Sequence, residues 1–148
     1  MLPKVTGEFR AATDPTLRFT PSGMAVAEFR VVADKKKKDD STGQWVDDKV
    51  CWLSVVCFKK QAENVAESVV KGTLVTVTGN LQTESYETKD TNEKRQKYVV
   101  VADNVGIALT WEPAKTVSTQ RSSAPAEDPW SSGGGSSGSS SQGEDPPF

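Results

Sequence analysis

The chain contains no histidine, only two cysteines and no long hydrophobic run. Histidine is the most frequent general base and metal ligand of enzymes, so its absence removes many catalytic and metal-binding designs. The sequence also lacks a GxxxxGK[ST] phosphate loop, a GxSxG nucleophile motif and a CxxC pair. We therefore expect no enzymatic activity, no cofactor and no metal site.

No apolar stretch approaches the length of a transmembrane helix, and the first residues, MLPKVTGEF, lack the apolar segment of a signal peptide. The expected location is the cytoplasm, with no membrane association. Cys51 and Cys57 lie six residues apart in one predicted strand, which separates them by roughly 20 Å. This distance is too long for an intrachain disulfide, so both are predicted to be free thiols, with a disulfide to a second subunit as the alternative.

The composition changes near Trp111. Up to this residue, 16 Lys and Arg stand against 15 Asp and Glu, whereas the remainder has 2 against 5. Residues 131–143 are only Ser, Gly and one Gln, a composition that cannot bury enough apolar surface to offset its ordering entropy. We predict a folded domain over residues 1–111, a disordered linker over 112–143 and an acidic tip over 144–148.

The stretch Lys49–Phe58, KVCWLSVVCF, is strongly β-prone and apolar on both faces. Trp52 and Phe58 point to one face of this strand, while Leu53 and Val55 point to the other. Something must cover the two rings on the first face. They either pack against a second sheet or subunit, or stack on the bases of a nucleic acid.

Further strands are expected at 2–12, 24–33, 73–83 and 96–109, with a short extended segment at 16–20 and a polar loop at 34–48. One short helix is expected at 60–70, where Ala62, Val65, Ala66 and Val69 form an apolar stripe. Five strands with one helix between the third and the fourth is the order of an OB-fold, a small Greek-key barrel that binds oligonucleotides. The predicted fold class is therefore all-β, a five-stranded OB-fold barrel with a disordered C-terminal tail.

Several motifs resemble those of the bacterial single-stranded DNA-binding protein family. They are a DPxxRxxxxG segment at 14–23 followed by Ala25-Val26-Ala27, Trp52 and Phe58 in a W-x5-F spacing, V-x-G-x-L at 77–81, and an acidic end that closes on Pro-Phe. The chain is most similar to the actinobacterial branch, and we interpret it as a paralogue there. The resemblance implies a nucleoid-associated homotetramer that binds single-stranded DNA without sequence preference. It also implies a C-terminal tail that recruits DNA replication, recombination and repair proteins.

The candidate residues follow from this resemblance and from the physics of stacking and phosphate contact. The rings expected to stack on bases are Trp45, Trp52, Phe58 and Tyr86. The cations expected to contact phosphates are Arg30, Lys35, Lys36, Lys37, Lys38, Lys49, Lys71, Lys94, Arg95 and Lys97. The tail residues expected to bind partner proteins are Glu144, Asp145, Pro146, Pro147 and Phe148. An OB-fold module that binds RNA or another protein is the alternative function.

Overall fold

The structure, a computed structural model, describes residues 1–116, and a compact unit spans Met1–Ala114. Its elements are β1 (Lys4–Ala11), β2 (Thr16–Phe19), β3 (Ala25–Lys38), β4 (Trp45–Phe58), α1 (Lys59–Ser68), β5 (Leu74–Glu87) and β6 (Lys94–Ile107). In this part of the chain, no helix combines the length and the apolar character that crossing a membrane requires.

The strands form one sheet in the order β1-β5-β6-β4-β3-β2, and a further pairing of β1 with β3 closes it into a barrel. The closing contact joins Arg10 to Val32 and Ala11 to Val31. The predicted five-stranded barrel is thus confirmed, with α1 between its third and fourth strands, β4 and β5. The extended segment at 16–20 forms a sixth strand, β2, which pairs only with β3 and lies outside the closed ring.

The barrel interior is filled by the apolar faces that the alternating sequence predicts. Phe29, Val31, Val55, Val75 and Val77 are almost fully buried. Each branched or aromatic side chain removed from water stabilises the fold by roughly 1.5–3 kcal/mol. On β4 the two faces separate as expected, because Leu53, Val55 and Cys57 are buried while Trp52 stays half exposed.

The helix α1 packs on the barrel through its short apolar stripe. Ala62 and Val65 are its buried residues, and Val69 follows them into the core just beyond the last turn. The helix ends at Ser68, two residues before the predicted end, because Val69 already has an extended backbone (φ −95°, ψ 131°). Branched residues such as Val69 and Val70 favour this conformation.

The prediction of a polar loop at 34–48 is wrong. This segment forms the outer part of a long β3–β4 hairpin, and only residues 39–44 make the turn. One pair of opposite charges, Lys36 with Asp47, favours this pairing, whereas the like charges of Lys35 and Lys49 also face each other. The turn is held by Asp39, which accepts hydrogen bonds from the backbone N–H and the hydroxyl of Ser41. These bonds lower the pKa of the Asp39 carboxyl, the backbone N–H being the largest cause.

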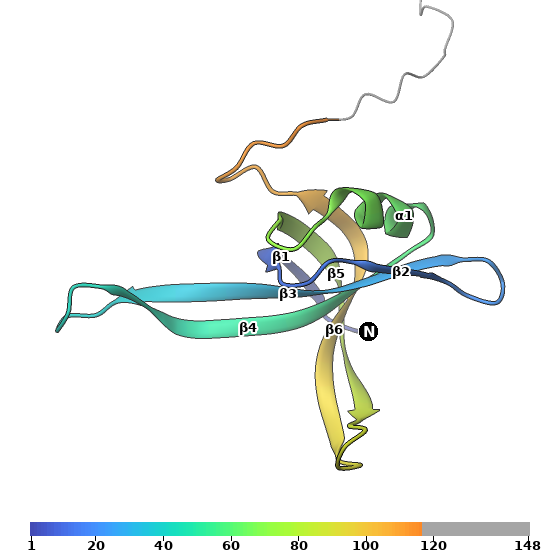
Figure 1. Cartoon of the computed structure of the whole chain (residues 1–148), viewed down its shortest axis with the longest axis horizontal. Helices are drawn as coiled ribbons and strands as arrows, with labels where there is room; N and C mark the ends of the chain where they lie inside the picture. The colour runs from blue at the N-terminus through green and yellow to red at the C-terminus, as the bar shows by residue number, and fades with distance from the viewer. Residues whose placement is uncertain (117–148) are drawn as a thin grey trace, which may run out of the picture. The chain divides into compact units, whose positions relative to one another are not determined.

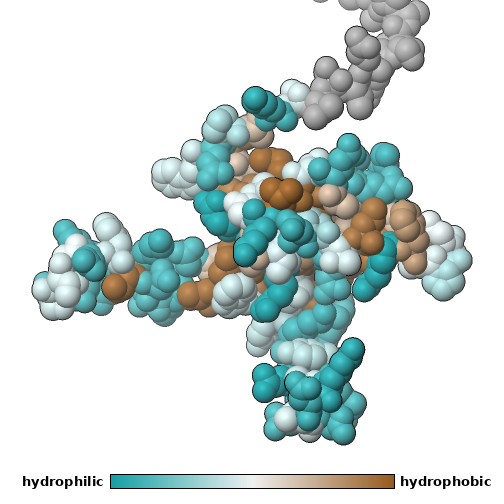
Figure 2. Space-filling view, viewed as in Figure 1, coloured by the Kyte–Doolittle hydropathy of each residue, from teal (hydrophilic) through white to brown (hydrophobic). Residues whose placement is uncertain are grey.

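The β5–β6 strands form a second long hairpin, and the two hairpins leave the barrel in different directions (Figure 1). Each contains one β-bulge. In the first, Asp48 has no partner between the pairs Lys35–Lys49 and Lys36–Asp47, and in the second, Asp103 has none between Thr78–Asn104 and Gly79–Ala102. The outer ends of both hairpins are mostly hydrophilic (Figure 2). We call the parts that project from the barrel the first arm (residues 34–50) and the second arm (residues 82–98).

Candidate nucleic-acid interface

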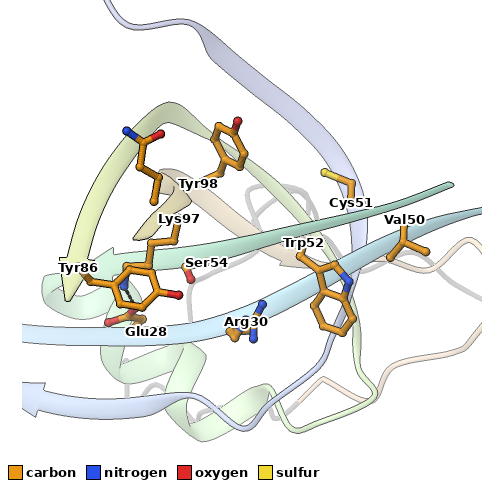
Figure 3. Close-up of a pocket in the computed structure, with 10 residues that line it drawn as sticks. Glu28, Arg30, Val50, Cys51, Trp52, Ser54, Tyr86, Lys97 and Tyr98 are labelled. Atoms are coloured by element: carbon orange, nitrogen blue, oxygen red, sulfur yellow. Dashed lines mark hydrogen bonds and ion pairs between the residues drawn. The ribbon is translucent and has the colours of Figure 1, made fainter. Parts of the chain in front are cut away.

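A cavity of about 770 Å³ lies where the two arms diverge (Figure 3). Its lining comes from four strands that are far apart in the sequence: Glu28, Arg30, Val50, Cys51, Trp52, Ser54, Tyr86, Gln96, Lys97 and Tyr98. The long β3–β4 pairing supplies one wall, and the β5–β6 pairing supplies the other. Within residues 1–116, no group of three or more His, Cys, Asp or Glu side chains is arranged to hold a metal ion.

Three aromatic rings stand half exposed in this cavity. The exposed fractions are 50% for Trp52, 43% for Tyr86 and 58% for Tyr98. Large rings are usually buried, so three exposed rings along one cavity favour a binding surface. Tyr86 shares a face of the second arm with Lys97, whereas Tyr98 lies on the opposite face. Sequence reasoning missed Tyr98, although an aromatic residue on the same strand face as the polar Gln96 in a charged hairpin was an available signal.

Arg30 places its guanidinium 5.1 Å from the centre of the Trp52 ring, within the range of a cation–π contact. The two residues reach each other diagonally, because Trp52 pairs with Val32 and Arg30 pairs with Ser54. The guanidinium covers part of one ring face. Half of the Trp52 surface is still exposed and can contact a planar ligand.

Lys97 crosses from β6 to β3 and forms an ion pair with Glu28, with 2.9 Å between Nζ and Oε1. The other carboxylate oxygen of Glu28 lies 3.7 Å from Nη2 of Arg18 on β2. Lys97 also lies 3.8 Å from Oε2 of Glu84, its cross-strand neighbour on β5. Sequence reasoning placed Lys97 at the site but missed Glu28, Arg18 and this pairing.

The bulge at Asp48 decides which side chains of the first arm share a face with Trp52. The side chains of two paired residues point to the same face of the sheet, and successive side chains along one strand alternate between its two faces. Along β3, residues 32, 34, 36 and 38 pair in turn with Trp52, Val50, Asp47 and Trp45 on β4. Trp45, Lys36 and Lys38 therefore lie on the Trp52 face, whereas Lys35, Lys37 and Lys49 lie on the other.

The remaining predicted residues lie outside the cavity lining. Phe58 is the last residue of β4, pairs with Val26 and is partly buried. Lys71 is an exposed residue in the turn after α1, where its backbone N–H donates to Asp14. Lys94 and Arg95 begin β6, with Arg95 directly across from Tyr86 on the second arm.

The predicted partner-binding residues Glu144, Asp145, Pro146, Pro147 and Phe148 lie outside the residues that the structure describes. The predicted linker also lies outside them from residue 117 onward.

A closed five-stranded barrel with projecting hairpins and exposed rings defines an OB-fold with an open ligand face. Residues 8–108 match the family described as the Single-strand binding protein family. The chain belongs to this family, which agrees with the prediction that it is not an enzyme.

Similar proteins from actinobacteria agree with the branch that the sequence motifs predicted. The chain is 38% identical over 151 residues to the single-stranded DNA-binding protein of Mycolicibacterium smegmatis, covering 91% of each chain. It is 47% identical over 108 residues to that of Corynebacterium glutamicum, covering 73% of this chain and 48% of the relative. The crystal structure of a small single-stranded DNA-binding protein from Streptomyces coelicolor has the same fold, with a TM-score of 0.64 and 21% identity, covering 73% of this chain and 95% of that one.

Proposed function

We propose that this chain binds single-stranded DNA without sequence preference, on the face where its two arms diverge. The observation that supports this most directly is the set of half-exposed rings, Trp52, Tyr86 and Tyr98, around one cavity. Family membership and the names of the relatives point the same way. The interpretation in which Trp52 is covered by a second sheet does not hold within the described chain, where the ring is half exposed.

Stacking explains the lack of sequence preference. Every base has a π-face, so a ring that stacks on bases accepts all four, at roughly 1–3 kcal/mol per base. A duplex hides these faces between neighbouring base pairs, so the rings engage unpaired strands. Trp45 extends the same ring-bearing face along the first arm.

Cations complete the proposed site. Arg30 lines the cavity, and Lys36 and Lys38 follow the Trp52 face outward along the first arm. Each of these side chains that contacts a phosphate releases a counterion from the DNA, so binding weakens as the salt concentration rises. Lys35, Lys37, Lys49, Lys71, Lys94 and Arg95 remain further proposed phosphate contacts, and Phe58 remains a proposed stacking ring.

Two further parts of the proposal concern assembly and partners. The first is a homotetramer: β1 pairs with β3 only at Arg10 and Ala11, so within residues 1–116 its edge from Lys4 to Phe9 has no neighbour on that side and can pair with a second copy. The second is recruitment of replication, recombination and repair proteins by residues 144–148, carried on the linker 112–143. The proposed location is the cytoplasm, on DNA.

Intrinsic tryptophan fluorescence tests the DNA-binding proposal. The full chain is titrated with a thymidine DNA homopolymer, its duplex with the adenine strand, and a uridine RNA homopolymer. Strong quenching by the single DNA strand, with little by the duplex, is the expected result. Equal or stronger binding of RNA would favour the RNA-binding module, and no quenching by any of the three would favour a protein-interaction module. Light scattering gives the solution mass and checks the tetramer.

A further inference from the structure

Glu28 is the one acidic residue among those that line the cavity, where the other charged groups are Arg30 and Lys97. Its side chain is only 28% exposed, and that of its partner Lys97 is 35% exposed. Charges held this far from water interact more strongly than pairs on the open surface. A carboxylate in this position stands where a DNA phosphate would otherwise approach Lys97.

We propose that Glu28 limits the DNA affinity of the site because it pairs with Lys97 and Arg18 and so keeps both cations from binding DNA phosphates. This inference rests on the proposed function. Glu28 accepts a hydrogen bond from Lys97 through one oxygen at 2.9 Å and faces Arg18 with the other at 3.7 Å, so it partly neutralises one cation on β6 and one on β2. A DNA phosphate that reaches Lys97 also comes close to the negative charge of Glu28, which repels it.

The arrangement predicts which cations act in DNA binding. Arg30 has no carboxylate partner within ion-pair distance in the described chain, whereas Lys97 has both Glu28 and Glu84. The sequence alone marks both residues as phosphate contacts. The structure separates them into one free cation and one cation that is already neutralised.

The test is the Glu28→Gln variant, which keeps the size and the hydrogen-bonding oxygen of the side chain but removes its charge. Affinity for a thymidine homopolymer is measured by fluorescence titration at several salt concentrations. We expect binding about 5-fold tighter at low salt. The slope of log affinity against log salt should become steeper by about 0.7, the value for one added phosphate contact on a single strand. In the Glu28→Gln, Lys97→Gln double variant, the part of both gains that comes from Lys97 should disappear, which leaves only the part that comes from Arg18.

Glu63→Gln is the matched control, because it removes the same charge from a Lys60–Glu63 pair of 3.1 Å on α1, outside the cavity. Glu28→Gln binding that equals this control, or is weaker, overturns the proposal. Should Glu28→Gln not fold, Glu28→Thr carries the test, since threonine removes the same carboxylate and favours a strand. It is expected to show the same gain over the control, and no gain would overturn the proposal. Failure of the wild-type chain to bind single strands would instead refute the proposed function itself.

Discussion

The guanidinium of Arg30 lies 5.1 Å from the centre of the Trp52 ring, so this cation and this ring act as one unit. Arg30 restrains the ring and adds positive charge beside the base that would stack on it. In Arg30→Lys the charge remains but the planar group is lost. We expect DNA affinity to fall by about 0.5–1 kcal/mol, with an unchanged salt slope. Fluorescence titration over several salt concentrations measures both, and wild-type affinity in this variant would show that the stack is incidental.

The Trp52 ring is half exposed, so its removal should affect binding more than folding. Trp52→Ala is expected to weaken single-stranded DNA binding by roughly 1–3 kcal/mol, the loss of one stacking platform. The melting temperature should change by only a few degrees. Trp111→Ala is the matched control, because Trp111 is 78% exposed and lies outside the cavity lining. An unfolded Trp52→Ala protein, or a folded one that binds normally, would contradict the assignment.

Inserting an alanine between Lys35 and Lys36 should turn Trp45 away from the binding face. The inserted residue supplies a partner for Asp48, so the bulge is lost and the side chains beyond it, including Trp45, move to the opposite face. We expect the same loss of affinity as in Trp45→Ala, roughly 1 kcal/mol or more. Combining the two changes should cost no more than either alone. Additive losses in this double-mutant cycle would mean that the bulge acts on DNA binding by another route.

Gly79 allows the two strands of the second hairpin to approach closely. A Cβ at this position would overlap the backbone oxygen of Val101, which cannot move without breaking the strand pairing. Gly79→Ala is therefore expected to lower the free energy of unfolding by about 2–3 kcal/mol. Gly106→Ala is the control, because its Cβ would meet nothing within 4 Å. Urea unfolding of both variants checks the difference, and equal stability would exclude the steric argument.

Cys51 and Cys57 should react differently with thiol reagents. Cys51 is exposed, whereas Cys57 is buried and burial raises its pKa from 9.0 to about 11. At pH 8 we expect one thiol per folded chain to react with a disulfide reagent, and two after unfolding in urea. Rapid reaction of both thiols in the folded protein would contradict the burial of Cys57.

The raised pKa of Cys57 also predicts a pH dependence of stability. The folded state holds this proton more tightly than the unfolded state, so stability is complete below about pH 9 and is lost as the pH rises toward 11. The loss should reach about 2–3 kcal/mol. Because lysines and tyrosines titrate in the same range, the measured quantity is the difference between wild type and Cys57→Ala in urea unfolding from pH 8 to 11. A difference that does not change with pH would contradict the prediction.

Removal of residues 144–148 should separate DNA binding from partner binding. These residues include two acids, whose charge repels DNA, so the truncated chain is expected to bind single strands equally well or slightly more tightly. Its contacts with replication, recombination and repair proteins should be lost. Pull-downs from cell extract with full-length and truncated chains make the comparison, and identical partner sets would end the proposal for the tail.

The sequence by itself determined the barrel, the helix and the two faces of β4. These features depend on local periodicity, since an alternating strand or a helical stripe is read from neighbouring residues. Trp52 and Val55 were predicted on opposite faces, and the structure confirms this, with Trp52 half exposed and Val55 buried. The order of strands and helix was enough to predict an OB-fold.

Only the tertiary structure decided how the site is assembled. Lys97 and Glu28 are 69 residues apart, and no local pattern shows that they meet. The face on which Trp45 lies depends on one unpaired residue, Asp48, because a shift by one residue reverses every side chain beyond it. The charged first arm was predicted as a loop because its residues are polar, yet pairing with a partner strand satisfies its backbone. Register and charge pairing arise between distant segments, and for this reason they appear only when the chain is folded.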